Sequence, residues 1–252
     1  MSELHSPVHF ISVERLKDVG VDLSILAYPS SEPSEVSKRV STMLKLGVSA
    51  LAVKPVGNHP SLLVLGKGVR GVVVLGLMED VKVAVKLMRT DASVKGMERE
   101  ASMHSKANGL GVGPKLFSWA DEMIVMEYVG GSRLGDLITA WQRKQLKPVI
   151  ESALNQAFIL DANQLDHGQL SNASDHVIAE QTGRTFIIDF SHSSTTRRPA
   201  NVTSFTSYLL NSLFRERPVH DLLQPLLRQY KQNLQPSLFL DLKKTILGLA
   251  EG

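Results

Sequence analysis

The stretch LLVLGKGVRGVVVLGLMEDVKVAVK, residues 62–86, decides the fold. It holds three short runs of aliphatic and β-branched residues, which are typical of strands, separated by glycine and acidic residues at turn positions. Residues 66–71 between the first two runs, GKGVRG, match a G-x-G-x-x-G pattern. A dinucleotide-binding fold needs a helix after these glycines, whereas here a strand follows. We therefore predict a hairpin whose bare backbone N–H groups can bind phosphate.

Lys86 ends the third of these runs, VAVK. Lysines at strand ends often protect a sheet edge from association and have no chemical role. The hairpin, however, places this strand beside the glycines, where an ammonium group can hold phosphate oxygens. Two acids in the next predicted helix, Glu98 and Glu100, are candidate partners for Lys86, and spacing alone does not choose between them.

The rest of the chain completes an α+β pattern. Residues 1–60 are predicted to form a helical extension, with a short helix between Ser12 and Gly20 and a longer one ending at a left-handed Gly47. Beyond residue 130, helical periodicity dominates. The elements predicted between and within these parts are a helix at 92–107, strands at 115–119 and 123–128, and strand-like runs at 176–179 and 185–189.

Composition limits the classes of function. The 252 residues include 28 basic and 25 acidic side chains, and a net charge of +3 does not by itself require a nucleic-acid partner. Cysteine is absent, which excludes disulfides, cysteine-ligated zinc and thiol catalysis. No apolar run reaches membrane-spanning length and the first residues lack a signal-peptide pattern, so we expect a cytoplasmic chain without a membrane partner.

The hairpin and VAVK, followed by MEREA at 97–101, GVGPKLF at 111–117 and IVMEYVGG at 124–131, resemble the protein-kinase-like fold in its small, atypical branch. The chain is similar to the RIO kinases, to the KEOPS-complex kinase and, most closely, to the predicted archaeal serine/threonine protein kinases. The resemblance covers residues 62–194. It implies a two-lobed α+β fold with a helical extension (1–60), a five-stranded antiparallel N-lobe (61–129) and a reduced helical C-lobe (130–252).

The resemblance also implies an ATP site between the lobes. Its expected residues in the N-lobe are Gly66, Gly68 and Gly71 over the phosphates, Lys86 on the phosphates, Glu100 as the ion-pair partner of Lys86, and Met126, Glu127 and Tyr128 as a hinge whose backbone binds adenine. In the C-lobe, DHGQL at 166–170 resembles the catalytic loop, and IIDFS at 187–191 resembles the metal-binding turn.

The catalytic loop departs from the family pattern at Gln169, which stands where the family has an aspartate base. An amide cannot take up a proton at neutral pH, although it can orient a hydroxyl. Asp166 and His167 adjoin Gln169 and are alternative bases, but a histidine at this place more often packs beneath the loop.

Asp189 is the expected ligand of Mg²⁺ or Mn²⁺. The second ligand stays open, because counting from His167 gives Ser174, whereas alignment on the apolar pair that follows gives His176. Asp175 and Asn172 are further candidates. His176 is the position that the apolar alignment favours.

The leading hypothesis is an ATP-dependent atypical serine/threonine protein kinase with an unidentified protein substrate. Self-phosphorylation is part of this hypothesis, with Ser193, Ser194, Thr195 and Thr196 as candidate acceptors. The alternative that follows from Gln169 is a pseudokinase, an ATP-binding scaffold without chemistry. Association with RNA or the ribosome is a further hypothesis, motivated by an isoelectric point near 9.1, and a metabolite kinase would use the same fold.

Overall fold

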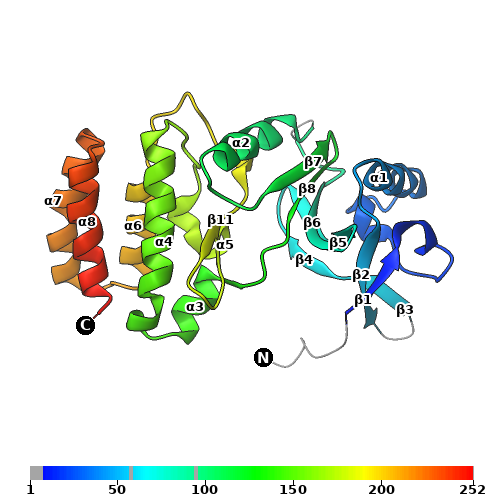
Figure 1. The fold of residues 1–252 in the computed structure, drawn as a ribbon, viewed down its shortest axis with the longest axis horizontal. Helices are drawn as coiled ribbons and strands as arrows, with labels where there is room; N and C mark the ends of the chain where they lie inside the picture. The colour runs from blue at the N-terminus through cyan, green and yellow to red at the C-terminus, as the bar shows by residue number, and fades with distance from the viewer. Residues whose placement is uncertain (1–7, 57–58, 94–95, 252) are drawn as a thin grey trace. The chain divides into compact units, whose positions relative to one another are not determined.

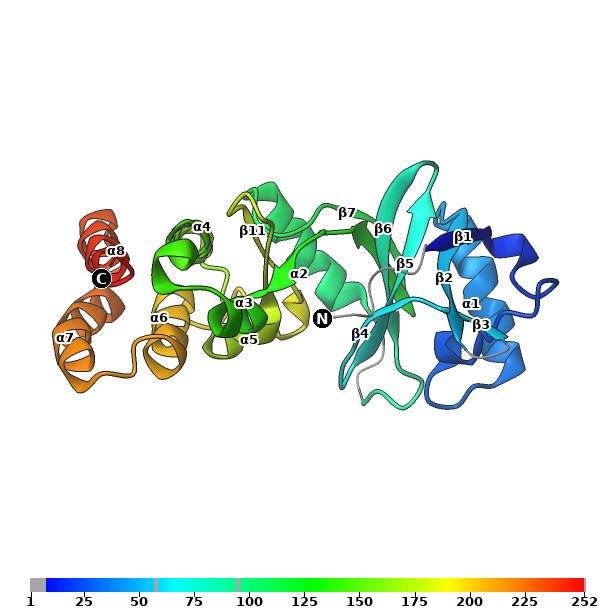
Figure 2. The ribbon, with the colours of Figure 1, turned by 90° about the horizontal axis from the view of Figure 1, so that it is seen from below.

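The computed structural model describes residues 8–56, 59–93 and 96–251, and these residues form two compact units (Figures 1 and 2). The first unit contains the chain up to Ala101 together with Lys115–Tyr128. The second contains Ser102–Pro114 and the chain from Val129 onward. Helices and antiparallel sheets are both present, so the predicted α+β class is confirmed.

The first unit is built on an antiparallel sheet of eight strands among the described residues. The main path through it is β1-β2-β5-β6-β8-β7, while β3 pairs with β2 and β4 pairs with β5. The strands are β1 (His9–Ser12), β2 (Ala50–Val56), β3 (His59–Leu62), β4 (Val64–Lys67), β5 (Gly71–Met78), β6 (Val81–Met88), β7 (Leu116–Ala120) and β8 (Met123–Glu127).

The five strand runs expected after residue 61 are present as β4 to β8, but the expectation of a purely helical extension is wrong, and the sheet is wider than expected. Three strands, β1 to β3, come from the first 62 residues, and β2 pairs directly with β5 through Leu51 and Gly76. Leu51, Ala52 and Val53 of β2 are all buried, but only Leu51 and Val53 belong to the core shared with α1, which is the period of a strand. Pro55 shortens the run and hides this signal in the sequence. The short helix expected after Ser12 is only a single 3₁₀ turn, η1 (Val13–Arg15). Residues 1–7 of the predicted extension lie outside the described chain.

One face of this sheet packs against the helix α1 (Pro33–Lys45). Alternate residues of the central strands point to this face, so that Val74, Val85 and Val125 join Met43 of α1 in one apolar core. Helix α1 ends where the sequence predicts, because Gly47 adopts φ +86° and Val48 N–H donates to Met43 O at 2.9 Å. The packing of α1 on this face thus stabilises the strands that carry the glycine hairpin.

Helix α2 (Glu98–Gly109) begins later than the predicted helix over 92–107. Gly96 adopts φ +81°, and Met97 N–H donates to Asp121 O at 2.9 Å, so the chain turns at these residues before the helix starts. Met97 and Ala101 pack with Ile124 of β8 in a small second core on the sheet face opposite α1. The first turn of α2 is thereby held on the face that also carries Lys86.

The second unit is mainly helical, as predicted. In Figure 1 the helices α4, α6, α7 and α8 run side by side, and their buried apolar faces share one core. A small antiparallel sheet in the order β11-β10-β9 belongs to the same unit. The elements are β9 (Ser132–Arg133), α3 (Leu134–Ala140), α4 (Arg143–Ala162), η3 (Leu170–Asn172), α5 (Ala173–His176), β10 (Val177–Ala179), β11 (Thr185–Ile187), η4 (Phe190–His192), α6 (Asn201–Ser212), α7 (Arg217–Gln232) and α8 (Pro236–Leu249).

None of the helices in the described part of the chain combines the length and apolar character that a membrane crossing needs.

Candidate functional site

Lys86 forms a buried ion pair with Glu100. Its Nζ donates to Glu100 Oε1 at 2.6 Å, and the lysine is only 6% exposed. Glu100 lies in the first turn of α2, whereas Glu98 on the same turn is exposed. The structure thus resolves the choice that sequence spacing left open, and Glu100 is the partner.

The glycine hairpin joins β4 to β5 beside Lys86. A Cβ atom placed on Gly71 would lie 2.7 Å from Leu87 O and 3.5 Å from Lys86 Cε, so only glycine fits there. A Cβ on Gly68 would meet nothing closer than Gly71 O at 3.8 Å, and Gly66 pairs with Val73 across the hairpin. Close packing therefore explains Gly71 alone, because Gly68 has room for a side chain and its N–H donates to Gly71 O at 2.9 Å.

Tyr28 contacts this hairpin, and sequence reasoning missed it. Lys67 Nζ lies 3.5 Å from the centre of the Tyr28 ring, and the Arg89 guanidinium lies 4.8 Å from it. Lys67 beside the phenol also lowers the pKa of Tyr28. A cation over a tyrosine ring is an attractive contact, so the segment around Tyr28 stabilises the position of the hairpin. No local pattern in the sequence signals a contact across so many residues.

The predicted hinge uses its backbone N–H groups within the first unit. Glu127 N–H donates to Lys115 O at 2.8 Å, and Tyr128 N–H donates to Lys82 O at 3.3 Å. The Glu127 carboxylate also accepts from Lys115 N–H at 3.0 Å. Adenine binding at Glu127 and Tyr128 stays a prediction, and within it these two N–H groups already have partners.

Asp166, in the second unit, is occupied as an anchor of the predicted catalytic loop. One carboxylate oxygen accepts from Arg197 Nε, and the other accepts from Ala200 N–H at 3.0 Å. Its backbone pairs with Ser194 on both sides. Because these donors satisfy the carboxylate, the geometry favours a positioning role for Asp166 over the role of a base.

His167 is fully buried beneath the loop, as a packed histidine should be. Its Nε2 lies 3.0 Å from Ile188 O, and since a carbonyl can only accept, Nε2 carries the proton. Its Nδ1 has no hydrogen-bond partner among the described residues. Burial lowers the pKa of His167 from 6.5 to about 4, so the ring is neutral near pH 7.

Stability should therefore depend on pH through His167. Between pH 6.5 and about 4 the unfolded histidine binds a proton that the folded one does not, so stability is complete above this range and is lost as the pH falls through it. We expect His167 alone to lower the free energy of unfolding by about 2 kcal/mol between pH 7 and pH 5. Urea unfolding at both pH values measures this, with His167→Gln expected to flatten the dependence and the exposed His192→Gln expected to retain it. An equal slope in the parent and in His167→Gln would contradict the assignment.

Gln169 presents an unpaired acceptor. Its Oε1 is buried and has no hydrogen-bond partner among the residues that the structure describes. An unsatisfied buried acceptor costs about 1–3 kcal/mol, and such an atom in a loop of this kind is suited to a ligand that donates a hydrogen bond. A hydroxyl group is a ligand of that chemistry.

Asp189 follows β11 in a left-handed conformation, with φ 68° and ψ 81°. For a residue other than glycine this conformation is strained, and such strain is concentrated at functional sites. Ser191 N–H donates to Asp189 Oδ1 at 3.2 Å and fixes the side chain at the start of η4. The local geometry therefore agrees with a role in binding a ligand.

The candidates for a second metal ligand differ in their surroundings. Asp175 pairs with Arg133 at 3.1 Å, and the Ser174 hydroxyl is packed against Gly135. His176 is nearly buried, and its Nδ1 lies 2.9 Å from Asn172 O, so this nitrogen carries the proton and Nε2 keeps its lone pair. His176 thus has the most suitable ligand atom. Across the described part of the chain, no three His, Asp or Glu side chains form a metal site by themselves.

Asn201, at the start of α6, is hydrogen-bonded to the predicted catalytic loop. The sequence analysis did not identify this residue. Its Oδ1 accepts from His167 N–H at 2.8 Å. Its own side-chain amide donates to Asp161 Oδ1 at 2.8 Å, and Asp161 also accepts from Tyr230 Oη at 3.0 Å. Asp161 is completely buried, and burial raises its pKa. The one signal in the sequence was Asp161 itself, a single aspartate among the apolar positions of a predicted helix, which indicates a buried polar contact.

Phe190, in the predicted metal-binding turn, packs against two histidine rings of the second unit. Its ring lies 5.1 Å from that of His104 on α2 and 5.4 Å from that of His167. A Cβ on Gly113 would lie 2.9 Å from Phe190 Cε2, so the glycine-rich turn after α2 packs against the same ring. These contacts fix the residue that follows Asp189.

The four hydroxyl residues after η4 are not equally accessible. Ser193 and Ser194 are buried, and Ser194 Oγ accepts from Thr196 N–H and Arg197 N–H. Thr195 and Thr196 are exposed. As acceptors for self-phosphorylation, the structure therefore favours the two threonines over the two serines.

No protein-family model and no curated protein sequence matches this chain. The resemblance to atypical kinases therefore depends on the motifs and on the local geometry described above.

Proposed function

We propose that the chain is an ATP-dependent atypical serine/threonine protein kinase. The observation that carries the proposal is the buried Lys86–Glu100 ion pair, 2.6 Å long, beside a hairpin that packs onto the lysine side chain at Gly71. Removing two ions from water is costly, and a buried ion pair is weak evidence for stability. A buried ammonium beside a glycine hairpin is best explained by a polyanionic ligand such as ATP. A cytoplasmic location belongs to the same proposal.

In the proposed reaction, Lys86 binds phosphate oxygens and Glu100 holds its ammonium in place. Asp189 and His176 would hold Mg²⁺ or Mn²⁺, and the ion would supply positive charge to neutralise the phosphates. The acceptor hydroxyl oxygen bonds to the γ-phosphorus, the bond from that phosphorus to the bridging oxygen breaks, and ADP leaves. Gln169 Oε1 accepts a hydrogen bond from the acceptor hydroxyl and orients it. Because an amide cannot take up the proton, the proton passes to a phosphoryl oxygen or to solvent.

A second function, an ATP-binding scaffold without chemistry, is favoured by a specific observation. Gln169 replaces the usual base, and the nearby carboxylate of Asp166 is already satisfied by Arg197 and Ala200. No carboxylate of the loop is therefore ready to accept a proton. The two functions differ in turnover and agree in predicting ATP binding.

Labelled ATP distinguishes them. We expect the purified parent, incubated with γ-labelled ATP and Mg²⁺ or Mn²⁺, to transfer label slowly to protein, and Gln169→Asp to transfer it roughly 10²-fold faster because a base is restored. Asp189→Ala is the blank and should stay at background. Equal labelling in the blank would overturn the kinase proposal. Absence of label in both the parent and Gln169→Asp, with ATP still raising the melting temperature, would establish the scaffold.

A further inference from the structure

Two residues with metal-binding side chains lie at the same end of the β10–β11 hairpin. Val177 pairs with Ile187, and one residue beyond this pair, Ile188 N–H donates to His176 O at 2.9 Å. Asp189 follows directly. Because the two strands are antiparallel, the residue before β10 and the residues after β11 lie at one end of the hairpin. His176 and Asp189 are thus neighbours, although a whole hairpin separates them in the sequence.

Their side chains lie around one buried ring, that of His167. The rings of His176 and His167 are 5.7 Å apart and meet edge to face. Burial has the largest effect on the pKa of His167, and the charges of His176 and Asp189 also act on this ring, so both side chains lie within electrostatic range of it. The two residues therefore belong to one local cluster, formed within the second unit.

His176 is held in the state that a metal ligand needs. The residue is only 8% exposed, and its Nδ1–H donates to Asn172 O at 2.9 Å. The lone pair is therefore on Nε2. This atom has no hydrogen-bond partner among the described residues and, unlike Nδ1 of His167, it is not sealed from solvent. Histidines that bind metals commonly donate their other ring N–H to a carbonyl in this way, which fixes the tautomer and the ring orientation.

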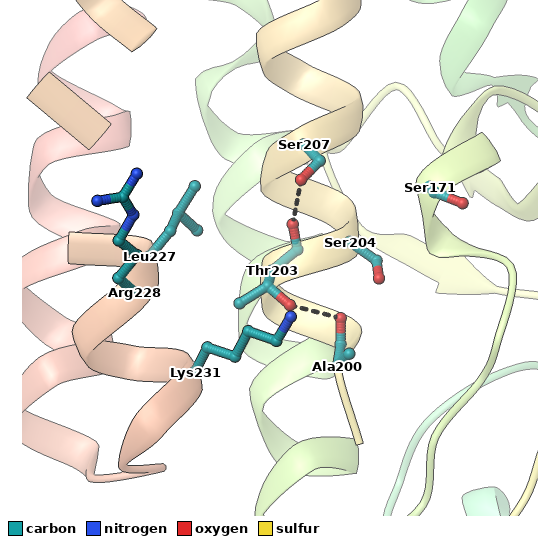
Figure 3. A pocket seen from close by; sticks show the side chains of 8 residues that line it. All are labelled: Ser171, Ala200, Thr203, Ser204, Ser207, Leu227, Arg228 and Lys231. Carbon is teal, nitrogen blue, oxygen red and sulfur yellow. Dashed lines mark hydrogen bonds between the residues drawn. The ribbon is translucent and has the colours of Figure 1, made fainter. Parts of the chain in front are cut away.

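The pocket among α6, α7 and η3, about 340 Å³ in volume, is a poorer place for a metal ion (Figure 3). Its lining consists of four hydroxyl residues, two apolar residues, Arg228 and Lys231. Among the described residues, neither a carboxylate nor a histidine lines it, and the two cations would repel a metal ion. The cluster of His176 and Asp189 is therefore the better candidate.

We propose that His176 makes the metal site selective for a first-row transition-metal ion such as Mn²⁺ over Mg²⁺. The inference rests on the proposed function, because the phosphates of ATP would supply further ligands. Mg²⁺ is bound through oxygen atoms and gives up its water reluctantly, whereas an imidazole nitrogen suits the transition-metal ions better. One nitrogen and one carboxylate from the protein therefore favour Mn²⁺, which accepts both kinds of donor.

Electron paramagnetic resonance of the full-length chain tests the proposal with Mn²⁺ and AMP-PCP, a non-hydrolysable ATP analogue without nitrogen in its phosphate chain. The histidines of the protein are labelled with nitrogen-15, and spin-echo spectra then report whether a histidine nitrogen is bonded directly to Mn²⁺. We expect a nitrogen-15 coupling in the parent. Competition with Mg²⁺ measures the preference between the two ions, and Mg²⁺ should displace Mn²⁺ only in large excess.

His176→Asn is the decisive variant, because its side-chain amide can still donate to Asn172 O while it presents an oxygen to the metal. It should lose the nitrogen-15 coupling. Its preference for Mn²⁺ over Mg²⁺ should fall at least about tenfold, since even the outer-shell partners of metal ligands contribute about 10–100-fold. Comparison with the parent also cancels the preference of the nucleotide itself. His176→Gln is the second variant if His176→Asn does not fold.

His9→Asn is the matched control, because His9 is exposed on β1, and it should behave as the parent does. Absence of the nitrogen-15 coupling in the parent, its persistence in the His176 variants, or an equal fall in preference in His9→Asn would overturn the inference. If AMP-PCP raises the melting temperature but no histidine coupling is found, ATP binding stands and the role of His176 falls. If the coupling is found but γ-labelled ATP yields no transfer, the metal site stands and the kinase function falls.

Discussion

Replacing Lys86 with alanine is expected to lower kcat/KM for phosphoryl transfer by about 10²–10³-fold. Removal of a single preorganised donor to a developing charge typically has an effect of this size. The substitution also leaves Glu100, whose side chain is only 11% exposed, without the partner that now lies 2.6 Å away. The change therefore removes a ligand for phosphate and takes away the ammonium that neutralises Glu100 where the phosphates are proposed to bind.

Lys82→Ala is the matched control, because Lys82 lies on the same strand and is exposed. It removes the same charge without touching Glu100 and should leave kcat/KM nearly unchanged. Rates of γ-phosphate transfer and the rise in melting temperature with MgATP should be measured for both variants and the parent. Equal activity in Lys86→Ala and the parent, with both folded, would remove Lys86 from the proposed mechanism.

Replacing Asp161 with alanine is expected to destabilise the second unit by about 3–5 kcal/mol. Asp161 accepts hydrogen bonds from both nitrogens of Asn201, from Val202 N–H at 3.1 Å and from Tyr230 Oη at 3.0 Å. Alanine would remove the shared acceptor of these donors, of which the Asn201 amide alone keeps another, Leu165 O at 2.8 Å. Each buried donor left unpaired costs about 1–3 kcal/mol. The loss exceeds that of an ordinary surface substitution several-fold.

Urea unfolding at pH 7 measures this effect, with Asp221→Ala on the exposed surface of α7 as the control. Asp161→Asn should cost less than Asp161→Ala, because an amide keeps the shape and one acceptor, and burial already raises the pKa of Asp161 toward the neutral form. Because Asn201 joins Asp161 to His167, phosphoryl transfer should fall in Asp161→Asn even where the fold is retained. Identical unfolding curves for Asp161→Ala and Asp221→Ala would contradict the role of this network.

The hairpin and its lysine could be predicted from the sequence because their signals are local. Strand periodicity, turn glycines and the position of Lys86 all lie within residues 62–86, and the register of β5 with β6 follows from the same stretch. The choice of Glu100 over Glu98 needed the structure, since both acids lie in the first turn of α2 and the rotation of that helix depends on packing against Ile124. Local patterns fix which elements exist, and packing fixes which side chain points inward.

The missing parts of the prediction are long-range. Strand β2 precedes the glycine hairpin in the sequence and pairs with its second strand, β5. Nothing in the β2 sequence, ALAVKPV, specifies this partner. Asn201 contacts His167 across 34 positions of the chain, and Tyr28 contacts Lys67 across a similar distance. A polar residue that begins a helix is usually a cap, so the contact between Asn201 and the loop had no signature of its own.

The contact between Tyr28 and Lys67 couples two segments that are far apart in the sequence, the residues around Tyr28 and the glycine hairpin. Free-energy coupling is reciprocal: the free energy by which a state of the hairpin stabilises the segment around Tyr28 equals that by which this state of the segment stabilises the hairpin. A ligand that draws Lys67 away from the ring must first give up the cation–π attraction. The segment before α1 and the hairpin therefore act as a linked pair, and occupancy at one changes the energy of the other.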